Sequence, residues 1–151
     1  MAVAVDYADI QSLVRFAHAS MTEARFFLLK VRSASALRAW LITAPVTSAV
    51  TLPRPSRTAL QIAFTRQGLE ALEVPRKAVA GFSDEFISGM AGDDNRSRRL
   101  GDVEANSPKN WKWGAGDKVP DALVMLFAEA GLLESWKESI TGQLWRTFQC
   151  Q

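Results

Sequence analysis

The sequence predicts an α+β domain in which helices pack on an antiparallel sheet. The chain has 151 residues, a length typical of one domain. Its hydrophobic fraction of 48% and charged fraction of 23% are those of a globular protein with a single core. Short apolar runs typical of strands alternate along the chain with segments of helical spacing. These observations exclude a disordered chain and predict a single domain over residues 1–151.

The first predicted strand covers residues 24–31, a short run rich in aromatic and aliphatic side chains. Alternation along a strand places Phe27 and Leu29 on one face and Phe26 and Leu28 on the other. Both faces are therefore apolar, and both need to be covered.

The next elements are bounded by capping residues and prolines. A helix is predicted over 33–42, because serines that can cap it precede apolar residues at helical spacing. Residues 46–52 alternate weakly and stop at a proline, as expected of an edge strand. A sharper strand covers 58–65, and its Thr65 is placed to cap a short helix that ends before Pro75.

The second half of the chain begins with a polar region. A short helix is predicted around 84–90, with Ser83 as its cap. Residues 92–120 show no periodicity and predict a long polar loop, which is either functional or held by its own anchors. A last strand over 121–128 is apolar on both faces. A C-terminal helix then carries one apolar stripe, formed by Leu133, Trp136, Ile140, Leu144 and Phe148.

This order of elements predicts a ferredoxin-like β-α-β-β-α-β domain with an antiparallel sheet. Helices cover only one sheet face in that arrangement, whereas two of the predicted strands are apolar on both. An exposed apolar face of that size marks an interaction surface. We therefore expect a second sheet to cover it, from another copy of this chain, as in dimeric α/β barrels, or from a second domain of the same architecture.

Charge and cysteine content exclude several classes of function. The net charge is +2, which does not predict nucleic-acid binding. No apolar run is long enough to cross a membrane, and no basic region precedes an apolar stretch at the N-terminus, so a cytoplasmic location is predicted. Cys150 is the single cysteine, which excludes an internal disulfide and a cysteine-based zinc site. The single histidine, His18, lies in a loop-like stretch and is interpreted as a surface residue.

Other candidate residues have simpler interpretations. The segment 109–114 interleaves lysines with tryptophans, as single-strand nucleic-acid platforms do, but we favour a loop anchored into the body by Trp111 and Trp113. The spacing of acidic residues fits no calcium loop, so no metal site is predicted. Tryptophans at helical spacing are interpreted as core residues, and the charged cluster as a solvated loop. These residues are Trp40 and Trp136 for the core, and Asp84, Glu85, Asp93, Asp94, Arg96, Arg98, Arg99 and Asp102 for the charged cluster.

A series of stretches, in matching order, resembles the N-terminal half of the dye-decolourising (DyP-type) haem peroxidases. The resemblance runs from about Asp9 to the end of the last predicted strand. The stretches that carry it are 9–11, 24–29, 59–65, Gly68-Leu69, Ala71-Leu72, 82–90, 100–102, Ser107-Pro108 and Trp111. The resemblance implies two ferredoxin-like halves whose sheets face each other, haem as cofactor, and peroxide-dependent oxidation of organic substrates by the complete unit.

The family's haem-binding features do not occur in this chain. The family carries a GxxDG motif at the start of its second half, and a distal arginine and a proximal histidine follow it. The nearest stretch here, 81–85, ends in glutamate instead of glycine and aligns with an ordinary first-half helix. His18 matches no ligand position of the family. No catalytic, haem-binding or metal-binding residue is therefore assigned in this chain.

Three functional hypotheses remain. The leading one is a non-catalytic half of a DyP-type peroxidase, truncated relative to the family, with the haem-binding half on another chain or lost. The alternative is a self-pairing dimeric α/β barrel whose two copies close over a small-molecule pocket. A weaker third hypothesis is an enzyme that uses the polar loop 92–120 as a lid, for which no acid–base pair is apparent.

Overall fold

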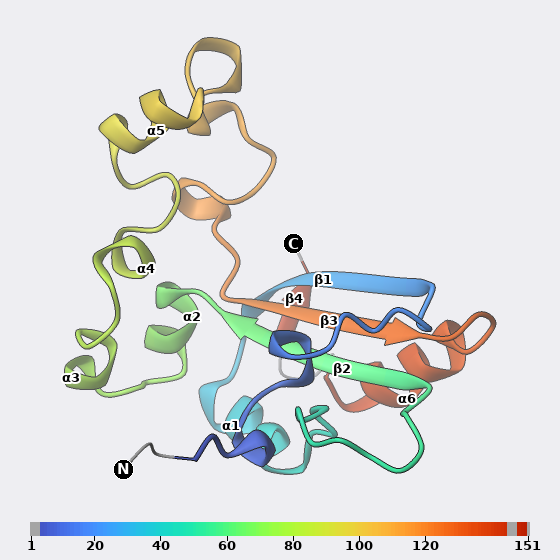
Figure 1. The fold of residues 1–151 in the computed structure, drawn as a ribbon. Helices are drawn as coiled ribbons and strands as arrows, with labels where there is room; N and C mark the ends of the chain where they lie inside the picture. The colour runs from blue at the N-terminus through green and yellow to red at the C-terminus, as the bar shows by residue number, and fades with distance from the viewer. Residues whose placement is uncertain (1–3, 145–147, 151) are drawn as a thin grey trace.

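An antiparallel sheet forms the body of the protein (Figure 1). The computed structural model describes residues 4–144 and 148–150. Three predicted strands are confirmed, and the sheet order is β2-β3-β1-β4 with every neighbouring pair antiparallel. The strands are β1 (Glu23–Val31), β2 (Thr58–Phe64), β3 (Ala122–Ala128) and β4 (Phe148–Cys150).

Two helices cover one face of this sheet and form the core with it. They are α1 (Ala34–Thr43) and α6 (Leu133–Leu144), and Figure 1 shows both on the same side of the strands. The helix α1 begins where predicted, because the Ser33 hydroxyl accepts a hydrogen bond from the Ala36 N–H at 3.3 Å. The largest core side chains from the sheet and from α1 are fully buried; they are Leu29, Leu37, Leu60, Val124 and Leu126.

The opposite side of the sheet, here called the open face, is covered by no α-helix of the described residues. The register places Phe26 beside Met125, and Met125 beside Gln61, so these three side chains form one row across the strands. Phe26 is 58% exposed, although it lies in the middle of the strand. The complete open face consists of Ala24, Phe26, Leu28, Ala59, Gln61, Ala63, Leu123, Met125 and Phe127.

The chain's own N-terminal segment, residues 10–22, covers part of the open face. Figure 1 shows it crossing in front of β2 and β3, on the side away from α1 and α6. It is preceded by the short helix η1 (Tyr7–Asp9) and contains η2 (Ser12–Val14). The sequence patterns did not predict this packing, which depends on polar side chains described below.

The predicted edge strand over 46–52 is wrong. Only Ser48 forms a bridge, with Gln11, and the rest of the segment is irregular. Thr47 instead satisfies the edge of β2 at one residue: its N–H donates to the Leu60 carbonyl at 3.0 Å and its hydroxyl accepts from the Leu60 N–H at 3.1 Å. A single residue thus replaces the ladder that a longer strand would form.

The predicted C-terminal helix is too long. The helix α6 ends at Leu144, and Phe148 lies in β4, where it pairs with Val31. Residues 145–147 lie outside the described residues. The apolar stripe continued past the helix because Phe148 suits a strand next to β1 as well as it suits a helix. The remaining members of the stripe, Leu133, Trp136 and Ile140, do pack in or against the core.

The region between β2 and β3 projects away from the sheet as an arm (Figure 1). Its caps at Thr65 and Ser83 are confirmed, since both hydroxyls accept from backbone N–H groups three residues later. The stretch 92–120 is not a structureless loop, because it contains α5, capped by Asp93, and three short 3₁₀-helices. The elements of the arm are α2 (Arg66–Ala71), α3 (Arg76–Val79), α4 (Asp84–Ser88), α5 (Asp94–Leu100), η3 (Glu104–Asn106), η4 (Pro108–Asn110) and η5 (Gly116–Lys118).

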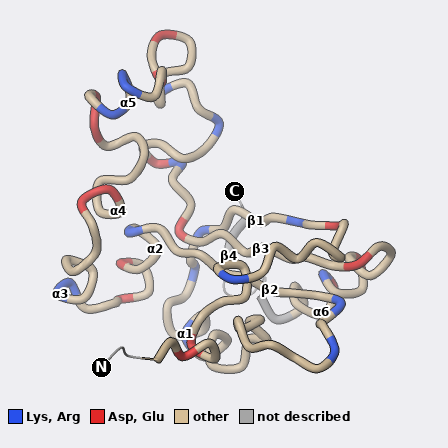
Figure 2. The backbone as a smooth tube through the Cα atoms, in the orientation of Figure 1, with Lys and Arg blue, Asp and Glu red and all other residues tan. Residues whose placement is uncertain are grey.

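Gly68 and the buried carboxylate of Asp121 determine how the arm joins the body. A Cβ on Gly68 would lie 1.8 Å from the Asp121 carbonyl oxygen, so only glycine lets α2 approach the start of β3 so closely. Asp121 is itself buried and bonds the Lys30 ammonium at 3.0 Å and the Val31 N–H at 2.8 Å. Figure 2 shows further charged residues of both signs along α4 and α5. None of the described helices is long and apolar enough to span a membrane.

Candidate functional site

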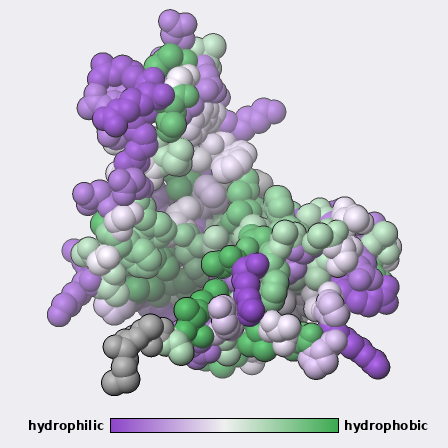
Figure 3. Space-filling model, viewed as in Figure 1, coloured by the Kyte–Doolittle hydropathy of each residue, from purple (hydrophilic) through white to green (hydrophobic). Residues whose placement is uncertain are grey.

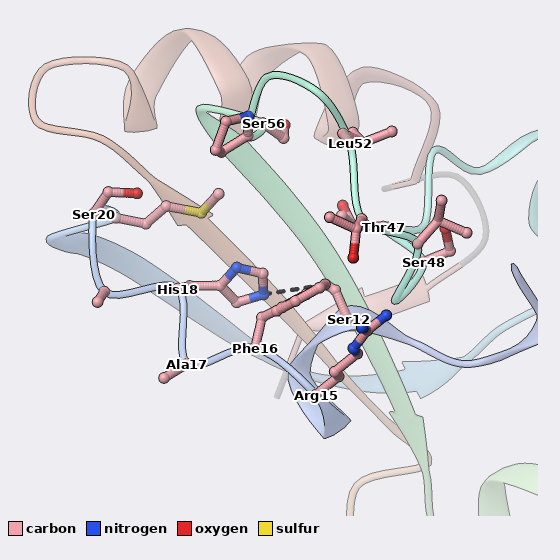
Figure 4. Close-up of a pocket in the computed structure, with 15 residues that line it drawn as sticks. Ser12, Arg15, Phe16, Ala17, His18, Ser20, Thr47, Ser48, Leu52 and Ser56 are labelled. Atoms are coloured by element: carbon pink, nitrogen blue, oxygen red, sulfur yellow. Dashed lines mark hydrogen bonds between the residues drawn. The ribbon is translucent and has the colours of Figure 1, made fainter. Parts of the chain in front are cut away.

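A cavity of about 470 Å³ lies between the N-terminal segment and the loop before β2 (Figure 4). Its apolar lining includes Phe16, Met21, Val50, Leu52 and Pro55. Arg15 and His18 are the ionisable residues that line it. The polar lining residues include Ser12, Thr47, Ser48 and Ser56.

The N-terminal wall of this cavity is held by hydrogen bonds to the backbone of β2 and of the loop before it. The Gln11 amide accepts from the Ile62 N–H at 2.8 Å and donates to the Ile62 carbonyl at 2.8 Å. The Ser12 N–H donates to the Thr47 carbonyl at 2.8 Å. The Gln11 side-chain amide therefore bonds the edge of β2 as a neighbouring strand would. This contact fixes the position of the residues that follow Gln11.

Gln61 supports the same segment from inside the sheet. Its side chain is fully buried on the open face, where most neighbours are apolar. Its Oε1 accepts from the Leu13 N–H at 3.0 Å, and its Nε2 donates to the Ser12 hydroxyl at 2.9 Å and to the Thr47 carbonyl at 3.0 Å. The buried amide is thus satisfied, as buried polar groups require.

His18 lies above the sheet within hydrogen-bonding distance of Ser12. The Ser12 Oγ and His18 Nε2 atoms are 3.1 Å apart, and the imidazole ring stacks at a tilt on Phe127 with 5.4 Å between centroids. The backbone of His18 adopts a φ of 50°, in the left-handed region that few residues other than glycine occupy. Partial burial lowers the pKa of His18 from its ordinary value of 6.5. Burial therefore favours the neutral imidazole.

The hydrogen bonds around Ser12 determine which ring nitrogen carries the proton. Gln61 Nε2 has no acceptor lone pair, so it donates to the Ser12 oxygen. The Ser12 hydroxyl proton is then available for His18 Nε2, which accepts it. In this neutral tautomer the proton of the ring is on Nδ1, and no described residue accepts a hydrogen bond from that atom.

Arg15 is engaged at the rim of the cavity. Its guanidinium donates to the Ala49 carbonyl at 2.9 Å and lies 4.0 Å from the ring centroid of Tyr7 and 5.1 Å from that of Phe16. Cation–π contacts of this kind hold the charge at the surface. Arg15 therefore clamps the N-terminal segment to the loop that follows α1.

A second cavity, of about 510 Å³, lies where the arm meets the body. It is bordered by the end of β2, by α4 and by the segment before β3, with Phe64, Glu85 and Trp113 among its lining residues. Figure 3 shows apolar surface in the angle between the arm and the sheet. The pKa of Glu85 is lowered by hydrogen bonds from its own backbone and from Ser83, and the side chain is fully exposed. Among the described residues that line this cavity, Arg66 is the one other ionisable residue besides Glu85.

The other sequence candidates are dispersed through the arm. Arg96 donates to the Ser88 hydroxyl at 3.0 Å and to the Gly89 carbonyl, and Arg98 donates to Asn95. No group of three or more described His, Cys, Asp or Glu side chains is placed to hold a metal ion. Asp84, Glu85, Asp93, Asp94, Arg99 and Asp102 belong to the arm or the turns within it.

The interpretation of the tryptophans is confirmed in the body and wrong in the arm. Trp40 is buried in the core, and the Trp136 indole N–H donates to the Ala59 carbonyl at 3.3 Å. Trp111 bonds the Asn106 carbonyl, within the arm itself, and Trp113 is 55% exposed. The arm is therefore folded on its own short helices: Trp111 is bonded within it, and the largely exposed Trp113 lines the cavity where the arm meets the body.

The residues that build the first cavity were largely missed in the sequence. His18 was interpreted as a surface residue, but it is half-buried and hydrogen-bonded. The available signal was Gln61, a polar residue within an apolar strand, which needed a buried partner. Cys150, in β4, pairs through its backbone with Leu29.

Comparisons with known proteins point to one fold. No family model and no curated protein matches the sequence. Among solved structures, a fungal DyP-type peroxidase from Auricularia auricula-judae superposes with a TM-score of 0.69 and 20% identity, over 99% of this chain and 32% of its own. A dye-decolorizing peroxidase in complex with 2,6-dimethoxyphenol gives a TM-score of 0.72 at 18% identity, over 98% of this chain and 33% of its own. A third DyP structure gives 0.74 at 17% identity, over 97% and 32%.

The chain has the fold of a DyP-type peroxidase domain. It spans about a third of the length of the solved structures that it matches. The resemblance predicted from the sequence is thus confirmed at the level of the fold, and the partial coverage fits the expected N-terminal half of a DyP-type chain.

Proposed function

We propose that this chain is the non-catalytic first unit of a DyP-type peroxidase. The complete unit would oxidise organic substrates with peroxide and haem, and the haem-binding residues would lie outside these 151 residues. The observation that carries the proposal is the coverage: nearly the whole chain superposes on DyP-type structures, but on only 32–33% of their length.

The sheet supports a ferredoxin-like assignment within this proposal. Counted from the other edge, the sheet order is β4-β1-β3-β2. Along the chain, α1 connects β1 to β2 and α6 connects β3 to β4. Every neighbouring pair is antiparallel. Two interleaved β-α-β units with this connectivity form the split arrangement of ferredoxin-like domains.

The open face supports a partner of similar shape. Phe26 is 58% exposed, and Leu28, Leu123 and Met125 beside it are only half-buried. The N-terminal segment covers the β2 side of this face and leaves the β1 side uncovered. A second sheet stacked on β1 would bury these side chains.

The residues of this chain do not fit a haem site. The single histidine directs Nε2 to Ser12, and in that tautomer Nδ1 carries the ring proton, so neither nitrogen offers a lone pair to iron; the ring itself packs on Phe127. Haem peroxidase chemistry also needs a group that transfers a proton beside the iron. Arg15, the other ionisable residue of that cavity, is bonded to Ala49 and stacked on aromatic rings. We therefore assign no step of the reaction to this chain.

A haem titration tests the proposal. The purified chain is mixed with haem, its visible spectrum is recorded, and turnover is measured with hydrogen peroxide and 2,6-dimethoxyphenol. We expect no stoichiometric Soret band and no activity above that of free haem. A stoichiometric Soret band with turnover contradicts the non-catalytic assignment, and loss of that band in His18→Ala would identify the ligand.

The source of the second half can be sought in the genome. A neighbouring reading frame that encodes a GxxDG-containing unit is the expected partner. Its co-expression with this chain should give an equimolar complex that binds haem. The cytoplasmic location inferred from the sequence remains a prediction.

An alternative function is a self-pairing dimeric α/β barrel that encloses a small molecule. The uncovered apolar side chains of β1 favour it, because two copies could cover each other there. Light scattering separates the alternatives. A monodisperse dimer supports self-pairing, whereas a monomer or a non-specific aggregate supports a half that lacks its partner.

A further inference from the structure

The first cavity has the dimensions and lining of a small-molecule site. Its volume is about 470 Å³, within the range of roughly 300–1,000 Å³ found for ligand pockets. Such pockets are mostly apolar and contain a few polar groups that fix the ligand's orientation. Here Phe16, Met21, Val50 and Leu52 supply the apolar wall. His18 is the polar ring among hydroxyl residues that include Ser48 and Thr51.

One hydrogen-bond donor points into this cavity without an acceptor. Because His18 Nε2 accepts from Ser12, the ring proton is on Nδ1. Figure 4 shows the second ring nitrogen pointing away from Ser12 and toward the loop that carries Ser56. The Ser56 hydroxyl donates to the Thr58 carbonyl at 2.6 Å and its oxygen accepts from the Thr58 N–H at 3.4 Å, so its described partner is Thr58 and not His18.

The charges around the cavity restrict the ligand. No carboxylate lines it, so a cationic ligand would find no counter-charge. Arg15 is an exposed residue whose guanidinium is bonded to the Ala49 carbonyl and stacked on Tyr7 and Phe16, so an anion that paired with it would lie at the exposed rim and not against the apolar wall. An uncharged ligand fits this environment best, because transfer of an unpaired charge into an apolar site is costly.

We propose that this cavity binds an uncharged, largely apolar small molecule that carries one acceptor such as a carbonyl oxygen, which receives a hydrogen bond from His18 Nδ1. The site is formed within one chain, by residues 12–21 and 47–56. It therefore depends neither on haem nor on a partner half, and it remains testable if the peroxidase proposal fails.

The probe is prodan, an uncharged naphthyl ketone whose fluorescence reports the polarity around it. We expect saturable binding of one prodan per chain, with a blue-shifted emission. His18→Phe keeps a ring that can stack on Phe127 but removes the donor, so it should weaken prodan binding roughly 5- to 10-fold, the effect of one lost hydrogen bond. Dimethylaminonaphthalene, which lacks the ketone, should bind both proteins equally.

A second pair of variants locates the site without touching His18. Leu52 lines the cavity and is 53% exposed, so Leu52→Trp should fill the cavity and abolish binding without unfolding the chain. Ile42, on α1, is 86% exposed and is not a lining residue, so Ile42→Trp is the matched control and should bind prodan normally. Circular dichroism and a urea midpoint verify that both variants are folded.

Three results would overturn the proposal. The first is no saturable binding up to about 1 mM prodan, the weak end of specific affinity. The second is binding that survives Leu52→Trp but is lost in Phe26→Glu, which would place the probe on the open face. The third is equal weakening of both probes by His18→Phe, which would show that the imidazole contributes shape and not a hydrogen bond.

Discussion

The two faces of the sheet are stabilised in different ways. The helix-covered face is filled by side chains of β1, β2 and β3 packed against α1 and α6, and its leucines are fully buried. The open face is covered only in part, by the N-terminal segment, and that cover depends on hydrogen bonds from Gln11 and Gln61. Apolar area thus stabilises one face, whereas satisfied polar groups hold the cover of the other face, whose β1 side remains exposed.

The largest effect is expected on the helix-covered face. Leu126→Ala should lower the free energy of unfolding by about 2–5 kcal/mol, because it leaves a cavity around a side chain that has no solvent exposure. Urea denaturation measures the loss. Met125→Ala is the matched control, one residue away on the half-buried open face, and should cost less than about 1.5 kcal/mol. Equal losses would contradict the difference between the two faces.

The second effect tests the polar clamp. Gln61→Leu should lower the free energy of unfolding by about 1–3 kcal/mol, because the Leu13 N–H and the Thr47 carbonyl each lose a partner. Amide hydrogen exchange should become faster at Leu13 and remain unchanged in β1. Ala63→Leu, at an exposed position of the same strand face, is the control. An unaltered exchange rate at Leu13 would show that the segment is held by other contacts.

The third effect is a pH dependence from His18. Burial lowers the pKa of His18 in the folded chain below 6.5, so the unfolded chain takes up the proton first. The contribution of neutral His18 to the free energy of unfolding should therefore be fully present above pH 6.5. It should be lost as the pH falls from 6.5 toward the lower pKa of the folded chain. The Ser12 hydroxyl and the Phe127 ring face the imidazole, and Arg15 is the other ionisable residue of the cavity.

Urea midpoints between about pH 5 and 8 measure this dependence, and His18→Phe should flatten it. The pKa values of the exposed Glu85 and Glu134 are also lowered, but from 4.5, so their contributions are lost below that window. A pH profile unchanged by the substitution would mean that His18 is as free to be protonated in the folded chain as in the unfolded one.

The smallest effect on stability is expected at Phe26. Phe26→Glu should lower the free energy of unfolding by about 0.5–1.5 kcal/mol, because 58% of the residue is already exposed and the substitution removes mainly its edge contact with the Phe127 ring. The same substitution should abolish association through the open face, since it puts a charge into an apolar contact. Light scattering and sedimentation detect the association, with Ile42→Glu on α1 as the control.

Patterns within a few residues predicted most of the body. The apolar runs indicated β1, β2 and β3 because alternation is a local property, and Ser33, Thr65 and Ser83 were identified as caps because their partners lie three residues away. The candidate site could not be predicted in this way. The hydrogen bond at its centre joins Ser12 and His18, which are close in the sequence. The amide that orients this bond belongs to Gln61, which is 49 residues away from Ser12.

The amino-acid sequence alone determined the type and approximate limits of the main strands and of α1, and it contained the resemblance to the DyP-type fold. Only the tertiary structure decided that 46–52 is not a strand, that 148–150 pairs with β1, and that the N-terminal segment crosses the open face. The physical reason is that every backbone N–H and C=O group needs a hydrogen-bond partner. Whether a segment becomes a strand, a bridge or a turn depends on which partner lies within reach. For these segments that partner comes from a distant part of the chain.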